Sequence, residues 1–197
     1  MNPKYFAHPK ALVDKGARIG AKTRIWAFAH VVADAEVGEC CNICDSVFVE
    51  GGAKLGNHVT VKNGVAVWEG VCAEDYVFIG PGAVFTNDRL PRTSIMRSKG
   101  EWLLPTRLKH GCTIGANATV ICGHVIGRFA FVAAGAVVTT DVPDHAMVSG
   151  VPARFRSWVC KCGSKLLVKS GTARCQRCKV RYVRTSEGLK PATAKQR

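Results

Sequence analysis

The sequence lacks any long hydrophobic run. No stretch of its 197 residues approaches the ~18 consecutive apolar residues that a membrane-spanning helix needs. The first ten residues, MNPKYFAHPK, also lack the apolar core of a secretory signal peptide. With 47% hydrophobic and 21% charged residues, the composition excludes a disordered chain and fits one globular domain with an appendage. We therefore expect a cytoplasmic protein that does not enter the membrane.

Acidic residues are scarce, and they are almost absent from the C-terminal part. The chain has 28 Lys and Arg against 14 Asp and Glu, a formal net charge of +14. Residues 160–197 hold 11 Lys and Arg and a single acidic residue, so most of the excess positive charge lies there. Such a segment attracts polyanions, which leaves nucleic-acid binding open as one class of function.

Long amphipathic helices are not expected either, because the apolar spacing is not three and four. Instead an aliphatic residue recurs every six residues, a period that an alternating strand does not explain. Three hexads can close one triangular coil whose aliphatic side chains point inward and stack on those of the next coil. We therefore expect a parallel β-helix of roughly six coils. The repeat is carried by Val13, Ile19, Ile25, Val31, Val37, Ile43, Val49, Leu55, Val61, Val67, Ile79, Leu108, Ile114, Val120, Ile126, Val132 and Val138.

The period breaks once, after Phe85, and resumes at Leu108. The break predicts a protruding loop over residues 86–107 within a β-helix domain of residues 1–158. Long loops in compact domains are usually functional, so we expect this one to form a wall of the site.

Several strings within the repeat, IGANATVICG, VGEC, IGPG and AAGAVVTTDVPDHAMVSGVPAR, resemble the left-handed β-helix acyltransferases of the hexapeptide-repeat superfamily. The resemblance covers about residues 8–158 and implies an all-β fold. The superfamily also contains carbonic anhydrase-like metal enzymes and proteins without catalysis, so the fold alone does not give the function. The metal enzymes need three converging histidines, and His58, His110 and His124 lack the spacing expected for that arrangement.

A narrower resemblance concerns RIWAFAHV, VFIGPGAVFTN followed by PR, the loop ending in LPT, and GCTIGANATVICG. These segments resemble N-acetyltransferases of nucleotide-linked 3-amino sugars, which implies a role in surface polysaccharide (lipopolysaccharide O-antigen) biosynthesis. Chain length and the spacing of the loop from Arg92 to Pro105 favour enzymes acting on UDP-2-acetamido-3-amino-2,3-dideoxyglucuronate, our first choice of substrate. The segments VWEGV and FTNDRLPR favour enzymes acting on dTDP-3-amino-3,6-dideoxyhexoses, our second choice.

The same resemblance implies a homotrimer that binds acetyl-CoA in a groove between neighbouring subunits. This arrangement has a physical reason, because a single solenoid has flat faces and a concave site forms more readily where two of them meet. On the cofactor side, the resemblance implies that backbone groups of small residues run along the pantetheine and that an arginine after the last coil meets the adenosine phosphates. These residues are Gly115, Ala116, Ala133, Ala134 and Arg154; the alternative for the arginine is a solvated position at the start of a helix.

Attack of a sugar amine on a thioester needs an oriented amine, a stabilised oxyanion and an acceptor for one proton. The departing thiolate can take that proton itself, so a strong base is optional. The resemblance points to Asn87, at the Phe-Thr-Asn position, as the residue that holds the amine; the alternative is that Asn87 only starts the loop turn. His110 and His124 are further candidates for a base, with structural turn histidines as the alternative.

The anionic pyrophosphate of the sugar nucleotide requires basic partners on the wall of the site. The candidate substrate-binding residues are Arg24, His30, Lys62, Asn63 and Arg92. For Trp26 and Trp68 we expect packing on the flat faces rather than stacking on a nucleobase, and for Glu50 and Glu69 solvated turn positions.

Two close cysteine pairs follow the β-helix. Four thiolates at such spacing can surround one tetrahedral Zn²⁺, and without a secretory signal a metal is favoured over disulfides. We therefore expect a four-cysteine, zinc-ribbon-like segment at 159–184 with a structural zinc ion, followed by a flexible basic tail at 185–197. The ligands would be Cys160, Cys162, Cys175 and Cys178, although the single residue inside the first pair departs from the usual spacing. The competing function is a nucleic-acid-binding protein that uses this basic zinc segment.

Overall fold

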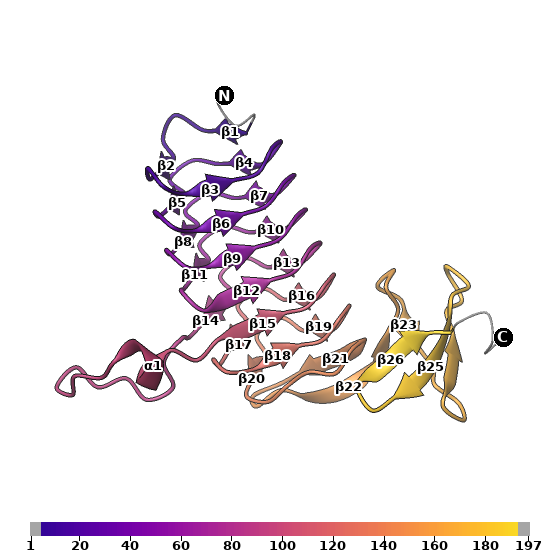
Figure 1. Cartoon of the computed structure of the whole chain (residues 1–197). Coiled ribbons are helices and arrows are strands. Elements are labelled where there is room, and N and C mark those ends of the chain that lie inside the picture. Colours follow the sequence, from indigo (N-terminus) through magenta and orange to yellow (C-terminus); the bar gives the residue numbers. More distant parts are fainter. Residues whose placement is uncertain (1–4, 193–197) are drawn as a thin grey trace.

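A computed structural model describes residues 5–192, whose short parallel strands wind into a β-solenoid (Figure 1). Each coil contributes strands to three faces, and strand partners in neighbouring coils are 18 residues apart, which is three hexads. The β-helix predicted from the six-residue period is thereby confirmed. Its first face stacks strands from eight coils, more than the expected six, because coil structure begins before Val13 and continues after Val138.

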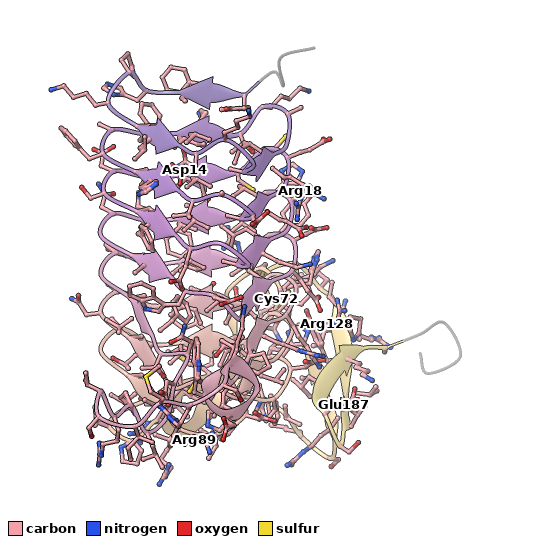
Figure 2. The ribbon with its side chains drawn as sticks, turned by 60° about the vertical axis from the view of Figure 1, so that its left-hand side comes forward. Asp14, Arg18, Cys72, Arg89, Arg128 and Glu187 are labelled. Atoms are coloured by element: carbon pink, nitrogen blue, oxygen red, sulfur yellow. The ribbon has the colours of Figure 1, made fainter. Side chains whose placement is uncertain are left out.

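Almost all solenoid strands are two residues long. The first face contains β1 (Phe6–Ala7), β4 (Arg24–Ile25), β7 (Asn42–Ile43), β10 (Thr60–Val61), β13 (Phe78–Ile79), β16 (Thr113–Ile114), β19 (Phe131–Val132) and β21 (Ala146–Ser149). The second face contains β2 (Leu12–Val13), β5 (His30–Val31), β8 (Phe48–Val49) and β11 (Ala66–Val67), then β14 (Val84–Phe85), β17 (Thr119–Val120) and β20 (Val137–Val138). The third face contains β3 (Arg18–Ile19), β6 (Glu36–Val37), β9 (Lys54–Leu55), β12 (Val71–Ala73), β15 (Thr106–Leu108) and β18 (Val125–Ile126). Figure 2 shows Arg18 and Cys72 along this third face.

The core is the stack of aliphatic side chains inside the coils. The repeat residues from Ile25 to Val138 are all buried, whereas Val13 and Ile19, in the first coil, are only half-buried. Small side chains such as Ala29 and Ala118 fill the remaining interior positions. No coil encloses its own side chains, so each depends on its neighbours for burial.

The protruding loop is confirmed and leaves the solenoid between β14 and β15 (Figure 1). Its insertion lengthens the sequence separation of the strand partners but keeps their register: Cys72 pairs with Lys54 above, 18 residues away, and with Arg107 below, 35 residues away. The loop contains α1 (Lys99–Trp102), whose first turn is closed by a capping box between Ser98 and Glu101. No helix within residues 5–192 has the length and apolar character needed to cross a membrane.

The C-terminal module, residues 159–192, continues from the last coil through β22 (Arg154–Val159), which pairs antiparallel with β21. It contains β23 (Lys165–Leu166), β24 (Thr172–Arg174), β25 (Arg181–Thr185) and β26 (Gly188–Pro191). Arg154 thus begins a strand, not the helix considered from the sequence. Part of the flexible tail expected at 185–197 is ordered instead: residues 188–191 form β26, which pairs with β25 and carries the buried Leu189. Residues 193–197 of that expected tail lie outside the described residues.

A column of aromatic rings connects the solenoid to this module. Neighbouring ring centroids are 4.6 to 5.4 Å apart from one coil to the next and then onto β25. The penultimate ring, His145, is 2% exposed, and burial lowers the pKa of its imidazole. The backbone of Asp144 adds hydrogen bonds to Glu187 and Leu189, so the module packs on the last coil. The column comprises His58, Tyr76, His110, Phe129, His145 and Tyr182.

Because neighbouring coils bury the repeat residues to different extents, replacing isoleucine by alanine should lower the free energy of unfolding by different amounts at different positions. Ile43→Ala, at a fully buried position, should lower the free energy of unfolding by about 2–5 kcal/mol. Ile19→Ala, in the half-buried first coil, is the matched control and should cost clearly less. Chemical denaturation of both variants checks this, and equal losses would contradict the stacked-core account.

Candidate functional site

The base of the protruding loop is held by one hydrogen bond between its two ends and by further hydrogen bonds to the neighbouring coils. Asn87 follows β14, and its backbone oxygen accepts a hydrogen bond from Leu104 N at 2.9 Å. Thr86 Oγ1 accepts another from Cys122 N at 3.0 Å, one coil below. The half-buried Asn87 side chain donates through Nδ2 to Glu69 O at 3.5 Å, and within residues 5–192 its Oδ1 accepts no hydrogen bond. A free amide oxygen is therefore fixed at the root of the loop.

Charged side chains tie the loop to the coils on either side. Lys99 of α1 forms an ion pair with Glu69, and Glu50 accepts a hydrogen bond from the backbone of Glu69 at 2.7 Å. Arg89, labelled in Figure 2, donates to Cys122 O at 3.1 Å. Glu69 is thus paired rather than simply solvated. The sequence does not indicate this role of Lys99, because nothing in the residue spacing shows that α1 folds back onto the turn that carries Glu69.

A second ion pair lies inside the loop. Arg97 binds both carboxylate oxygens of Asp88, the residue after Asn87, and this contact lowers the pKa of Asp88. Asp88 Oδ1 also accepts a hydrogen bond from Leu90 N at 2.9 Å. The turn that begins at Asn87 is therefore fixed, and the loop tip beyond it carries the exposed Arg92.

The two candidate bases lie at different corners of the solenoid. His124 follows Gly123, against which the loop packs: an added Cβ there would come within 3.0 Å of Arg89 and 3.7 Å of Leu104. His124 Nδ1 is 3.4 Å from Asp141 Oδ1, a carboxylate that the sequence did not single out. His110 lies instead in the aromatic column, between Tyr76 and Phe129. Only His124 is near the root of the loop.

His30 starts a row of rings on the second face that runs toward this root. Its Nε2 lies 3.0 Å from Asp14 Oδ1, and its ring contacts Phe48 at 5.5 Å between centroids. Phe48 in turn contacts Trp68 at 5.6 Å, and Trp68 directly precedes Glu69. The row packs ring against ring, which agrees with the packing role expected for Trp68.

Three of the five candidate substrate-binding residues, Arg24, Lys62 and Asn63, line one open hollow of about 360 Å³. It lies at the first corner, where the first face turns into the second. Trp26 also lines it and donates from Nε1 to Asn42 Oδ1 at 2.8 Å. Asn87 and Arg92 belong to the opposite edge of the second face, so one chain does not bring all these groups together.

The candidate cofactor residues follow Lys62 and Asn63 down the same first corner. The N–H groups of Ala116 and Ala134 donate to no acceptor within the described part of the chain, so both remain available to a ligand. Gly115 has a different reason for its small size: a Cβ would lie 2.5 Å from Ala134 N, so close stacking of the coils requires glycine there. Arg154 lies exposed just beyond this column, with its guanidinium donating to Ala153 O at 3.1 Å.

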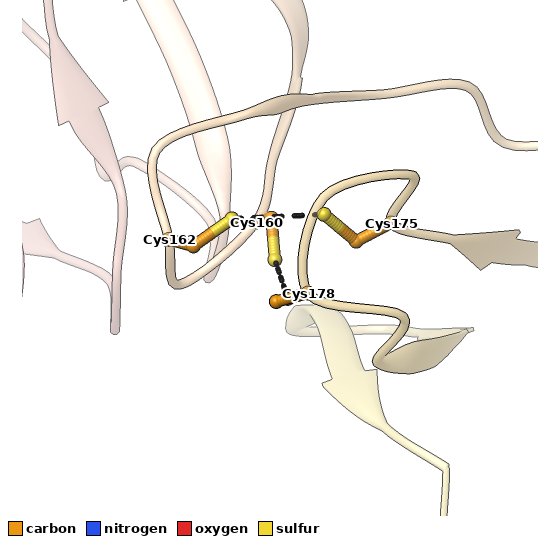
Figure 3. Close-up of side chains that lie close together, drawn as sticks. All are labelled: Cys160, Cys162, Cys175 and Cys178. Carbon is orange, nitrogen blue, oxygen red and sulfur yellow. Dashed lines mark hydrogen bonds between the residues drawn. The ribbon is translucent and has the colours of Figure 1, made fainter.

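The four cysteines of the C-terminal module converge, as Figure 3 shows. Their sulfur atoms lie within 4.8 Å of one another, and all four thiols are free. Tetrahedral zinc with ~2.3 Å bonds requires sulfur atoms about 3.8 Å apart, so the cluster has a suitable size. Within residues 5–192, no other group of three or more His, Cys, Asp or Glu residues brings its ligand atoms together, and the three histidines of a carbonic anhydrase-like site do not converge in one chain.

Comparison with known proteins gives clear relatives, although no protein-family model matches the chain. The dTDP-3-amino-3,6-dideoxy-alpha-D-galactopyranose 3-N-acetyltransferase of Aneurinibacillus thermoaerophilus is 48% identical over 177 residues, 90% of each chain. The acetyltransferase domain of PglB from Neisseria gonorrhoeae, solved with acetyl coenzyme A, is 25% identical with a TM-score of 0.50; the match covers 76% of this chain and 56% of that one.

A third relative supports the fold. A hexapeptide-repeat acetyltransferase of Vibrio cholerae, also solved with acetyl coenzyme A, is 24% identical with a TM-score of 0.54 and matches 62% of this chain and 70% of its own. The six-residue coils, the protruding loop and a relative of nearly equal length at 48% identity lead to one conclusion. The chain belongs to the hexapeptide-repeat N-acetyltransferases, acetyl-CoA-dependent enzymes that modify nucleotide-linked amino sugars.

Proposed function

We propose that this enzyme acetylates the 3-amino group of a dTDP-3-amino-3,6-dideoxyhexose, in the cytoplasm, for surface polysaccharide biosynthesis. The observation that carries this substrate is the 48% identity, over 90% of both chains, to an enzyme named for such a sugar. The UDP-linked glucuronate, first choice from the sequence, therefore becomes the competing substrate. The segments VWEGV and FTNDRLPR also favour the dTDP sugars.

The reaction forms one bond and breaks one. The sugar nitrogen attacks the acetyl carbonyl carbon, the C–N bond forms, and the C–S bond to CoA breaks. The nitrogen loses one proton, and the departing thiolate can accept it, since a thiol has a pKa of about 8.5. The protein must therefore mainly orient the amine and stabilise the developing oxyanion.

Asn87 is the residue that we propose orients the amine. Its side-chain oxygen is free of partners within residues 5–192, and an amine N–H can donate to that oxygen. The hydrogen bond from Leu104 to its backbone and the Asp88–Arg97 pair beside it hold Asn87 in place before substrate arrives. Such preorganisation is worth more than a flexible contact of the same kind. His124, with Asp141 beside it, is the nearest candidate for a base.

A homotrimer would complete the site. In one chain the first corner, with Lys62, Asn63 and the free N–H groups, is separated by the second face from Asn87 and Arg92. A neighbouring copy can place its loop against that corner, which puts all candidate groups in one groove. The loop tip supports such a contact, because Leu90, Ile95 and Met96 are 69%, 57% and 95% exposed.

Acetyl-CoA would then lie along the first corner. The free N–H groups of Ala116 and Ala134 are one coil apart and can donate to pantetheine carbonyls. Arg154, at the end of the same column, can pair with the adenosine phosphates. Arg24 and Lys62, in the hollow at the upper coils, would bind the pyrophosphate of the sugar nucleotide.

We further propose that the cysteine cluster holds one structural zinc ion. Four sulfur ligands would close the coordination sphere, so the metal would leave no position open for a substrate. The zinc would hold the two turns that carry the cysteine pairs. Tyr182 links this cluster to the solenoid, because its hydroxyl is 3.1 Å from Cys160 Sγ and its ring contacts His145.

The substrate assignment predicts a clear preference in a direct assay. With acetyl-CoA, the enzyme should convert dTDP-3-amino-3,6-dideoxyhexoses to products heavier by one acetyl group, as mass spectrometry would show. The matched control is UDP-2-acetamido-3-amino-2,3-dideoxyglucuronate, which should react much more slowly. Faster acetylation of the UDP sugar would overturn the substrate proposal and leave the enzyme class intact.

The role of Asn87 predicts a loss of turnover without loss of structure. Asn87→Ala should lower kcat by about 100-fold, the scale expected when a reacting group is misplaced. Asn57→Ala is the control, because Asn57 bonds to Glu39 N at the third corner, away from the loop. Light scattering should report trimers for both variants. Unchanged turnover in Asn87→Ala would remove this residue from the mechanism.

The zinc proposal predicts one metal ion per chain after washing with a weak chelator. Replacing Cys175 and Cys178 by Ser should abolish zinc binding and open the C-terminal module to proteases, with the solenoid still folded. Cys72→Ser, at an exposed cysteine outside the cluster, should keep the metal. Elemental analysis measures this, and a protease-resistant module without zinc would rule the proposal out.

A further inference from the structure

A cavity of about 620 Å³ lies within the C-terminal module, and only residues between 165 and 192 line it. None of them is a candidate residue for acyl transfer. Four of the lining residues are cationic, Lys165, Lys169, Arg174 and Arg181, and none is acidic. Its volume falls in the range of small-molecule sites, roughly 300–1,000 Å³.

The hairpin of β24 and β25 places two of these cations directly opposite each other. Ala173 and Tyr182 are paired and buried, at 7% and 1% exposure, so they form the inner side of the hairpin. Side chains alternate along a strand, and the neighbouring pair, Arg174 and Arg181, therefore shares the outer side. Like charges directly opposite on a sheet destabilise it, and an anion between them removes that cost.

No carboxylate of the described chain neutralises this set. None of the ion pairs within residues 5–192 includes Lys165, Lys169, Arg174 or Arg181. Glu187, labelled in Figure 2, is the single acidic residue of residues 160–192. It lies 2.7 Å from Lys190 and belongs to another pair. Four unpaired cations around one cavity can therefore bind more than one phosphate group.

The cavity also has apolar and neutral polar walls. Leu167, 74% exposed, and Val183 supply apolar surface, whereas Thr172 and Gln176 supply hydrogen-bonding groups. A ligand with a charged end and a ring system that forms hydrogen bonds matches this combination. Inorganic phosphate would use only the cationic part.

We propose that this cavity binds the diphosphate end and the nucleoside of a nucleotide ligand, as a second nucleotide site separate from the acyl-transfer groove. Both substrates of the enzyme class contain such a group, the sugar nucleotide and the adenosine part of CoA. The site would therefore bind nucleotides that the reaction uses or releases.

Single-stranded nucleic acid fits the cavity less well. Proteins that bind single strands stack the bases on exposed aromatic rings. Tyr182 is the one aromatic residue of residues 160–192; it is 1% exposed, and its hydroxyl is engaged with Cys160. Tyr182 thus lines the cavity without an exposed face on which successive bases could stack, and Leu167 and Val183 supply the apolar contact for the single base of a nucleotide.

Equilibrium binding to the full-length protein at about 0.15 M salt, a physiological ionic strength, tests the proposal. The probes are dTDP and CoA, and the number of sites per chain is the readout. The test variant is R174Q/R181Q, and the control is K161Q/K179Q, which removes two charges from the same module outside the cavity. We expect the test variant to lose one dTDP or CoA site per chain that the unmodified protein and the control variant retain.

This difference does not depend on the acyl-transfer proposal. If dTDP does not bind the acyl-transfer groove, the unmodified protein should still bind one equivalent and the test variant none. Acetyl transfer should stay within twofold in both variants. Equal numbers of sites in the two variants would overturn the proposal, and so would binding of a single-stranded RNA oligonucleotide in place of dTDP and CoA. If the test variant loses the dTDP site, the ligand is the sugar nucleotide; if it loses the CoA site, the ligand is CoA.

Discussion

Burial of side chains by the next coil is the interaction on which this molecule depends. Each coil presents its aliphatic residues inward, and only the coils above and below remove them from water. The spacing of the coils is so small that Gly115 cannot carry a Cβ without meeting Ala134 N at 2.5 Å. The result is a narrow prism with a filled interior. Its chemistry must therefore lie on corners, on an inserted loop, or between copies.

The inserted loop adds a candidate site to the solenoid without interrupting the stacking of its coils. The loop is inserted at a single corner, and strand pairing resumes in register below it, with Cys72 against Arg107. The hydrogen bond from Leu104 to Asn87, between the two ends of the loop, and the Lys99–Glu69 pair fix its root. The corner that would bind acetyl-CoA needs no insertion, because its turns leave N–H groups such as that of Ala116 unbonded to the described chain.

The C-terminal module is too small to bury a large hydrophobic core. Its interior consists of Leu166, Ala173, Tyr182, Leu189 and the cysteines. A zinc ion would supply the missing stability. The aromatic column through His145 connects the module to the last coil, so its cationic outer side is held in a defined position. Four of the positive charges of the module are therefore arranged around one cavity.

The sequence by itself determined the solenoid, the position of the loop and the four clustered cysteines, because a period of six and a cysteine pattern are properties of neighbouring positions in the chain. It did not determine that Arg154 begins a strand or that β26 extends the module, since both depend on pairing with distant strands. Only the tertiary structure showed that Lys62 and Asn87 lie at different corners, and that Arg174 faces Arg181. Contacts between residues far apart in sequence leave no local pattern, so the fold must bring them together before they can be recognised.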